Sequence, residues 1–270
     1  MSDATAPDPA ALAGVRGLLA DRVAIVTGAA SGIGFATARL FARQGASVAL
    51  ADVDRHGVER AAATLTAEGL DVLSVACDVA VEAQVEQLID VAVQRFGGLD
   101  VLFNNAGIEQ PVTPSHEVDA DLFSRVIDVN LKGTFFGCKH AVPRMLERGG
   151  GTIVNNSSVS AFANVGGNVS YASSKGAVMS LTRVLALEHA RSGIRVNAIN
   201  PGVIDTAMNE RNLSLADDVE TVRARWAAAT PLGRMATPDE VAWTVLFLAS
   251  PMSSFTTGVG LLVDGGRVAT

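Results

Sequence analysis

The chain has 270 residues, of which 49% are hydrophobic and 18% are charged. This composition favours a globular protein with a large core and excludes a disordered chain, a collagen or a disulfide scaffold. The 21 basic and 28 acidic residues give a formal net charge of −7, so the chain lacks the basic surface of a nucleic-acid-binding protein and no such partner is expected. Cys77 and Cys138 are too few for a disulfide framework, which fits a reducing cytoplasm.

The chain shows no signal for membrane insertion or secretion. No segment approaches the roughly 20 uninterrupted apolar residues of a membrane span. Residues 1–20 contain acidic residues and prolines but no basic stretch before an apolar block, so they predict a flexible N-terminal extension rather than a signal peptide. We expect residues 21–270 to form one domain. The four histidines never occur at metal-ligand spacing, so no metal site is expected.

Short apolar runs alternate with longer helical patterns after residue 20. The runs that predict strands are Val23–Thr27, Ser47–Ala51, Val72–Ala76, Val101–Asn104, Thr152–Asn155, Arg195–Ile199 and Leu261–Val263. The patterns that predict helices are Ile33–Gln44, the region around Val58–Ala67, Val81–Phe96, Leu122–Leu146, Tyr171–His189 and Pro238–Ala249. This alternation predicts a doubly wound, Rossmann-type three-layer α/β sandwich with a seven-stranded parallel sheet. Such a sheet binds its ligand at the carboxyl ends of the strands.

A glycine-rich turn connects the first predicted strand to the first predicted helix. Residues 27–34 read TGAASGIG, in which Gly28 permits a tight turn, Gly32 a close approach of phosphate and Gly34 close packing of helix on strand. Backbone N–H groups of such a turn, here also those of Ser31 and Ile33, can bind a pyrophosphate at the helix N-terminus. The alternative is a glycine-rich turn that binds nothing, because GxxxGxG differs from the general dinucleotide fingerprint.

An acidic residue follows the second predicted strand. Asp52 lies twenty positions after Gly32, where a carboxylate can accept hydrogen bonds from ribose hydroxyls and repel a 2′-phosphate. The neighbouring Ser31 and Val53 are neutral, which favours NAD over NADP as the cofactor. Arg55 is close enough in sequence to leave NADP open.

The next two strand ends carry small and polar residues. Cys77, Asp78 and Val79 follow the third predicted strand, and Asn105, Ala106 and Gly107 follow the fourth. We expect both segments to line the adenine and ribose of the cofactor. Neither segment is specific by itself, since an Asn at such a place can equally close a turn.

A tyrosine and a lysine form the candidate catalytic pair. Tyr171 is the only tyrosine, and Lys175 follows four positions later in a predicted helix, so both side chains share one face. A nearby ammonium group lowers the pKa of a phenol, which would let Tyr171 exchange a proton with an alcohol or ketone oxygen. Ser158 lies thirteen residues earlier, at the end of the fifth predicted strand, within reach of the same oxygen. The alternative for the pair alone is a half-buried tyrosine beside a lysine.

These motifs resemble those of the short-chain dehydrogenases/reductases over about Asp21 to Arg267. The matching motifs are TGxxxGIG at Thr27–Gly34, NNAG at Asn104–Gly107, Asn130, Ser158, YxxxK at Tyr171–Lys175 and Pro201-Gly202. The resemblance implies that Asn130, Ser158, Tyr171 and Lys175 form the catalytic set, with Asn130 holding a water that connects Lys175 to solvent. It also implies that Lys175 contacts the nicotinamide ribose. Pro201, Gly202, Ile204 and Thr206 resemble the loop that faces the nicotinamide, and the Asp52 position resembles that of NAD-preferring members.

The resemblance implies hydride transfer between NAD and a secondary alcohol or ketone. Tyr171 exchanges the proton, Ser158 holds the oxygen, and no metal takes part. The region 204–232 resembles the substrate lid of this family. A homotetramer or dimer is expected by the same resemblance.

An apolar wall is expected beside the catalytic residues. It would be formed by Phe162, Val203 and Met208, next to Ser158 and Tyr171. The absence of Arg or Lys from this wall suits an uncharged substrate, and cyclic or steroid-like secondary alcohols are candidates. Glu109 is either a polar contact of the substrate or a solvent-facing residue.

Three other functions remain open at this point. One is an NADP-dependent reductase of ketones or 3-oxoacyl thioesters. The second is a dinucleotide-binding scaffold without catalysis, which has no need of all four catalytic residues. The third is a methyltransferase-like nucleotide fold, which has no use for the YxxxK helix.

Overall fold

The computed structural model describes residues 17–164, 166–206, 208–209 and 218–269. Its centre is a seven-stranded sheet in the order β3-β2-β1-β4-β5-β6-β7, in which every neighbouring pair is parallel. The strands are β1 (Val23–Thr27), β2 (Ser47–Asp52), β3 (Val72–Ala76), β4 (Val101–Asn104), β5 (Gly151–Asn156), β6 (Ile194–Pro201) and β7 (Gly260–Val263). The strand order reverses between β1 and β4, so the ligand site of a doubly wound sheet is expected at their carboxyl ends. The predicted fold class is confirmed.

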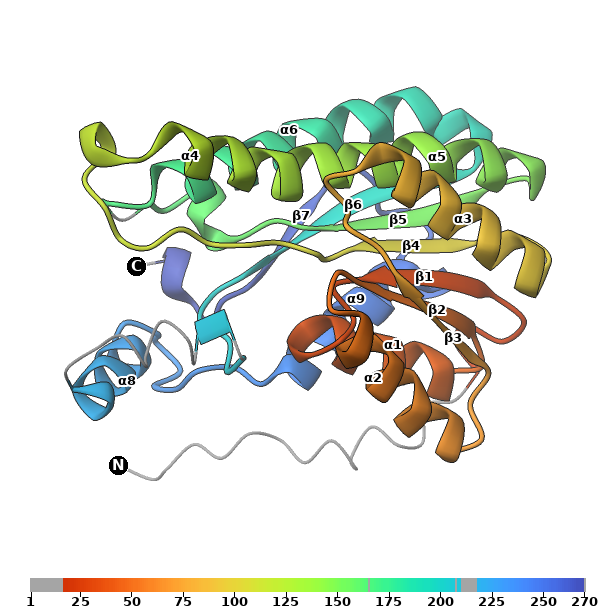
Figure 1. Cartoon of the computed structure of the whole chain (residues 1–270), viewed down its shortest axis with the longest axis horizontal. Coiled ribbons are helices and arrows are strands. Elements are labelled where there is room, and N and C mark those ends of the chain that lie inside the picture. The colour runs from red at the N-terminus through yellow and green to blue at the C-terminus, as the bar shows by residue number, and fades with distance from the viewer. Residues whose placement is uncertain (1–16, 165, 207, 210–217, 270) are drawn as a thin grey trace.

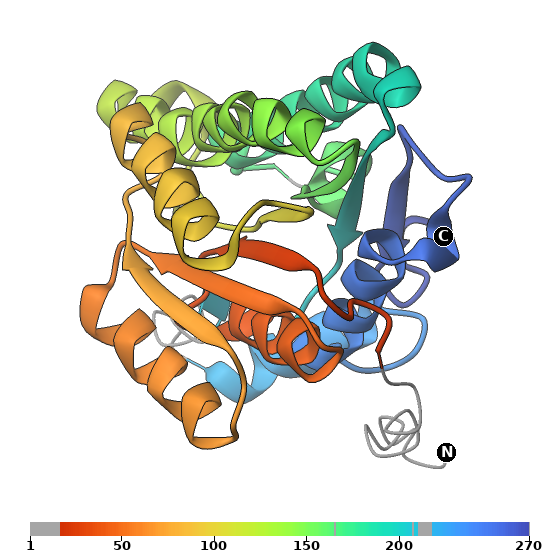
Figure 2. The same cartoon turned by 90° about the vertical axis from the view of Figure 1, so that its right-hand side faces the viewer.

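Helices cover both faces of the sheet (Figure 1 and Figure 2). The helices on one face are α3 (Glu82–Phe96), α4 (Ala120–Ile127), α5 (Gly133–Glu147) and α6 (Val169–His189). The helices on the other face are α1 (Gly32–Arg43), α2 (Arg55–Ala67) and α9 (Pro238–Ala249), while α8 (Val219–Ala228) lies beyond the end of the sheet. Within the described residues, none of these helices is both long enough and apolar enough to cross a membrane.

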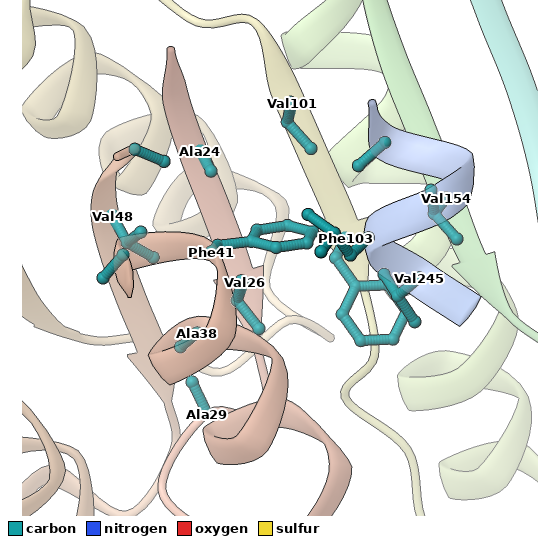
Figure 3. Packing of buried hydrophobic residues seen from close by; sticks show 14 of the residues in the cluster. Ala24, Val26, Ala29, Ala38, Phe41, Val48, Val101, Phe103, Val154 and Val245 are labelled. Carbon is teal, nitrogen blue, oxygen red and sulfur yellow. The ribbon is translucent and has the colours of Figure 1, made fainter. Parts of the chain in front are cut away.

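The core forms two layers because alternate side chains of each strand point to opposite faces. Ala24 and Val26 of β1 pack with α1 and α9, whereas Ile25 packs on the opposite face of the sheet. Figure 3 shows the first layer, where Phe41 of α1 and Phe103 of β4 meet. Both phenyl rings are fully buried. This packing holds the carboxyl ends of the central strands in place.

The start of α9 agrees with its sequence pattern. The Thr237 hydroxyl accepts a hydrogen bond from the N–H of Glu240, whose carboxylate accepts one from the N–H of Thr237. This capping box satisfies two N–H groups that a helix leaves unpaired. The helix spans Pro238–Ala249 as predicted.

The predicted helix over Leu122–Leu146 lies within an uninterrupted helical run, but the run is not α-helical throughout. A π-helical segment, Asp128–Lys132, separates α4 from α5. Gly133 then packs so closely that a Cβ on it would lie 2.8 Å from Cγ2 of Val79. A π-helical turn keeps a helical run going while changing which side chains face inward, which the apolar periodicity cannot report.

The ends of the chain pack more closely than the sequence suggested. Residues 1–16 of the expected extension lie outside the described residues. Leu19 belongs to the core, with 1% of its surface exposed, so ordered packing begins before residue 21. Near the C-terminus, the N–H of Leu232 donates to the carbonyl of Gly265, which joins the chain after α8 to the turn after β7.

Candidate active site

The turn between β1 and α1 needs glycine at three places. Gly28 and Gly32 have φ values of +65° and +55°, a region that side chains disfavour. A Cβ on Gly34 would collide with the carbonyl oxygen of Gly28. The Ser31 side chain makes no capping hydrogen bond. The first N–H groups of α1 therefore fit an anionic group such as a pyrophosphate.

The residues after β4 support this turn. The N–H groups of Asn105 and Ala106 both donate to the Thr27 hydroxyl, over 2.9 and 3.0 Å. The Asn105 amide donates to the carbonyls of Thr27 and Gly28. Asn105 therefore fixes the glycine-rich turn, which agrees with the turn-closing alternative, whereas its contact with a cofactor stays a prediction. Asn104 is buried and donates to Asn155 instead.

The carboxylate of Asp52 lies beside the same turn. It accepts a hydrogen bond from the N–H of Ala30 and another from the N–H of Asp54, both over 3.0 Å. The side chain of Val53 is 67% exposed. Arg55 is also exposed and approaches Glu59, one turn further along α2, at 4.0 Å. The Asp52 carboxylate thus lies at the carboxyl end of β2, beside the glycine-rich turn.

The end of β3 contributes less than expected. Cys77 is buried in the core, and its burial raises the pKa of the thiol to about 11. Val79 is also buried, against Gly133. Asp78 remains partly exposed and pairs with Arg125 at 3.3 Å. Of these three residues, only Asp78 offers a side chain to a ligand.

The structure brings Ser158, Tyr171 and Lys175 together. Ser158 follows β5 in extended backbone, and its hydroxyl accepts a hydrogen bond from the N–H of Ser160. It lies close enough to Tyr171, in the first turn of α6, to lower the pKa of the phenol. The Lys175 ammonium lies 5.4 Å from the centre of the Tyr171 ring and donates to the carbonyl oxygen of Asn156 over 2.6 Å. Asn156 has no counterpart in the sequence prediction, because its contact uses a backbone atom that any residue would provide.

Burial controls the protonation of the pair. It raises the pKa of Tyr171, and the Glu109 carboxylate raises it further, whereas the bond to Ser158 lowers it. Burial also lowers the pKa of Lys175 to about 8, an effect that Glu109 opposes. Burial is the largest influence on the pKa of Tyr171, and the expected lowering by the Lys175 ammonium stays a prediction. Burial disfavours the charged form of Lys175, and its ammonium group donates a hydrogen bond to the carbonyl oxygen of Asn156.

Asn130 lies in the π-helical segment and holds the chain after β4. Its Oδ1 accepts from the N–H of Ile108 over 2.8 Å, and its amide donates to the carbonyl of Ile108 and to the Ser174 hydroxyl. The side chain thus reaches the residue next to Lys175 rather than Lys175 itself. The water-mediated connection between Asn130 and Lys175 stays a prediction.

The loop after β6 packs against the glycine-rich turn. A Cβ on Gly32 would lie 3.4 Å from Cγ2 of Thr206. Ile204 is buried in the core, and its backbone forms a β-bridge with Ala236. Pro201 ends β6, and a Cβ on Gly202 would collide with Asp264.

The three residues of the expected substrate wall are described, whereas the expected lid is described only in part. Phe162 is 46% exposed, while Val203 and Met208 are half-buried. Of the expected lid over 204–232, residues 207 and 210–217 lie outside the described residues, and α8 forms its second half. The site also holds Glu109, which accepts a hydrogen bond from the Asn168 amide over 3.1 Å. No short motif connects these two residues, which are 59 positions apart.

Comparisons with known proteins agree with these features. A family model described as "Enoyl-(Acyl carrier protein) reductase", one of the short-chain dehydrogenase/reductase models, matches residues 28–267. The chain is 46% identical to cis-4-hydroxycyclohexanecarboxylate dehydrogenase of Sinomonas cyclohexanicum, over 93% of this chain and 98% of that one. It is 42% identical to L-fucose dehydrogenase of Oryctolagus cuniculus, over 92% of this chain and 85% of that one. The crystal structure of levodione reductase superposes with a TM-score of 0.90 at 37% identity, covering 93% of this chain and 99% of that chain.

Proposed function

The chain belongs to the short-chain dehydrogenase/reductase family, and we propose that it is an NAD-dependent enzyme that interconverts a secondary alcohol and a ketone. The observation that carries this proposal is the buried Lys175 ammonium, which lies 5.4 Å from the centre of the Tyr171 ring, with Ser158 close to the same phenol. A phenol beside a second hydroxyl and an ammonium group is placed to exchange a proton with a substrate oxygen. The relatives named above are an alcohol dehydrogenase of a cyclic acid, a sugar dehydrogenase and a ketone reductase.

Each catalytic residue has one role in this proposal. In the oxidation direction, Tyr171 accepts the hydroxyl proton of the alcohol, and Ser158 holds the same oxygen by a hydrogen bond. Lys175 supplies positive charge next to the Tyr171 ring. Asn130 connects α6 to the chain after β4 through its hydrogen bonds to Ser174 and Ile108. The proton leaves toward solvent through Lys175 and the water that we place at Asn130. NAD, when bound, accepts the hydride from the alcohol carbon.

The cofactor is proposed to lie across the carboxyl ends of β1 and β4. The N–H groups at Ser31–Gly34 would hold the pyrophosphate, and Asp52 would accept the ribose hydroxyls. Asp78, Ala106 and Gly107 would line the adenosine side, and the loop over 201–206 the nicotinamide side. NAD is favoured over NADP because the Asp52 carboxylate would face the 2′-phosphate, while Arg55 is exposed beside Glu59.

An uncharged cyclic alcohol or ketone is the proposed substrate class. Phe162, Val203 and Met208 would form the apolar wall beside Ser158 and Tyr171. The part of the chain over 204–232 would close over it.

We also propose that the chain assembles as a homotetramer. Phe135 of α5 and Val184 and Leu187 of α6 are exposed hydrophobic residues, and Leu187 is 83% exposed. A Cβ on Gly176 would meet nothing within 4 Å, so this face of α6 does not pack on its own sheet. A second exposed group, Met252, Phe255 and Leu262, lies at the β7 end of the sheet. Two separate apolar surfaces suit the two kinds of interface of a tetramer with dihedral symmetry.

The test of the enzymatic function measures NADH or NADPH formation. Purified protein receives NAD or NADP with a panel of linear, cyclic and steroidal secondary alcohols. We expect turnover with NAD on cyclic alcohols, and we expect Tyr171→Phe to bind NADH normally but to lose activity by at least about a hundredfold, since removal of a general acid–base group costs this order.

Three results would contradict parts of this proposal. Activity in Tyr171→Phe within a few-fold of the wild type would reject the role of Tyr171. Turnover only with NADP would reject the Asp52 argument. NAD binding without turnover on any alcohol or ketone would favour a non-catalytic scaffold.

A further inference from the structure

The chain after β4 is fastened to the chain before α6. The N–H of Thr113 donates to the carbonyl of Gly167 over 2.9 Å, and the Gln110 amide donates to the same carbonyl over 3.2 Å. The Gln110 Oε1 accepts from the N–H of Ser170 over 2.7 Å. Gln110 is 3% exposed, so these hydrogen bonds are shielded from water. The two segments therefore form one rigid wall at the start of α6.

This wall fixes the position of the Glu109 carboxylate. Glu109 directly precedes the buried Gln110, and its Oε1 accepts from the Asn168 amide over 3.1 Å. Asn168 lies three residues before Tyr171, at the N-cap of α6. On the other side, a Cβ on Gly107 would lie 3.6 Å from the Lys175 ammonium. The carboxylate is thus held by Asn168 at the start of α6, three residues before Tyr171, on a segment that also passes close to Lys175.

The charge of Glu109 reaches both members of the catalytic pair. It raises the pKa of Tyr171 and that of Lys175, as a nearby negative charge does. Glu109 is half-buried, so solvent screens its charge less than at an exposed surface site. Any substrate bound at Tyr171 lies in this field.

We propose that Glu109 determines substrate specificity by excluding anionic substrates and by accepting a hydrogen bond from a second hydroxyl group of a neutral alcohol. This proposal rests on the proposed alcohol dehydrogenase function and narrows its substrate class to uncharged diols and polyols. Two like charges a few ångströms apart in a partly buried site repel by enough to lower kcat/KM at least about tenfold. A carboxylate also accepts hydrogen bonds more strongly than neutral groups do.

The charge is tested with a matched pair of substrates. The pair is 4-hydroxycyclohexanecarboxylate and 4-hydroxycyclohexanecarboxamide, which differ in charge but little in shape. We expect the wild type to prefer the amide in kcat/KM by at least about tenfold. In Glu109→Gln, which keeps the shape of the side chain, the preference should fall close to one. Glu117→Gln is the control, because it removes the same charge from an exposed residue of the same loop.

The hydrogen bond is tested with cyclohexanediols and cyclohexanol. The wild type should prefer at least one diol isomer in kcat/KM by about tenfold, the size of a hydrogen bond to a charged group. Glu109→Gln retains an acceptor and should keep part of this preference, whereas Glu109→Leu should lose it. Binding of NADH, followed by fluorescence, should be unchanged in both variants.

The outcomes separate this proposal from the function on which it rests. Absence of NAD-dependent turnover with every alcohol rejects the dehydrogenase function itself. Turnover with equal preference for acid and amide in the wild type, or a preference that Glu109→Gln leaves unchanged, overturns the role of Glu109 alone. A diol preference that survives in Glu109→Leu also overturns it.

Discussion

At the scale of single residues, burial makes the catalytic pair sensitive to nearby charge. Tyr171 and Lys175 each lose hydration, so the charged form of each is disfavoured in the chain by itself. Glu109 acts on both groups in the same direction, because a negative charge disfavours the phenolate and favours the ammonium. We therefore expect the pH dependence of catalysis to respond to a residue outside the expected catalytic set.

The sign of this effect gives a pH prediction. Glu109 raises the pKa of both groups, so Glu109→Gln should lower both apparent values of the coupled pair. Alcohol oxidation needs the deprotonated phenol, so the acidic limb of the kcat/KM profile should move to lower pH. The measurement is the pH profile of both proteins with one neutral alcohol. If the acidic limb stays in place or moves to higher pH in Glu109→Gln, then the charge of Glu109 does not raise the pKa values of Tyr171 and Lys175.

Tyr171 being the only tyrosine allows an independent check. The near-ultraviolet absorbance of phenolate reports this one residue without interference from others of its type. In the complex with NAD, a shift of this titration should accompany the shift of the kinetic limb. If the acidic limb of the kcat/KM profile moves but the absorbance titration of Tyr171 does not, the limb reports the ionisation of another group.

At the scale of elements, the break between α4 and α5 places Asn130. A regular helix over this region would carry Asn130 on a different face, because each π-helical turn holds one more residue than an α-helical turn. Asn130 instead points to Ile108 and Ser174, and so connects the chain after β4 with α6. Gly133 allows this geometry, since its Cα packs against Val79.

Gly133→Ala tests this packing. Alanine is the better helix former by about 1 kcal/mol, so propensity by itself predicts stabilisation. We expect the opposite, a loss of about 1–2 kcal/mol in the free energy of unfolding, because the added methyl group would overpack against Val79. Urea unfolding measures the difference. Lys132→Ala serves as the control, since Lys132 is exposed and pairs only with Asp128 at the surface, where such pairs contribute little.

At the scale of the whole molecule, two groups of exposed apolar residues are candidates for subunit interfaces. One group lies on α5 and α6, and the other lies around β7, where Phe255 is fully exposed. Leaving both groups in water is unfavourable, and burial between subunits would remove that cost. Each group would then form one of the two interfaces of the proposed tetramer.

A single charged substitution in each exposed apolar group should disrupt one of the two proposed interfaces and leave the other intact. Leu187→Asp and Phe255→Asp should each give dimers, and the double variant should give monomers, because each substitution places a charge in only one apolar surface. Sedimentation velocity measures the size. Val81→Asp is the control, since Val81 is exposed at the N-cap of α3, where an acidic residue is favourable. A wild type that sediments as a monomer, or single variants that remain tetrameric, would contradict the assignment.

Much of this protein can be predicted from local patterns in its sequence. Periodicity defines the seven strands and most of the helices, because the burial of one face requires a period of two or of 3.6 residues. The glycine-rich turn and the Tyr171–Lys175 pair are also local, since the spacing within one turn or one helix decides whether their groups meet. For this reason the fold class and the candidate catalytic residues needed no knowledge of the tertiary structure.

The remaining features depend on residues that are far apart in the chain. The π-helical break depends on Val79 and Ile108, which pack against the Asn130–Gly133 region from other elements. The hydrogen bond between Glu109 and Asn168 joins residues 59 positions apart, and Lys175 is bound by a backbone carbonyl that has no side-chain signature. The pKa values of the catalytic pair follow from burial, which the whole packed molecule creates. Contacts of this kind exist only after the sheet and its helices have assembled, so no local pattern contains them.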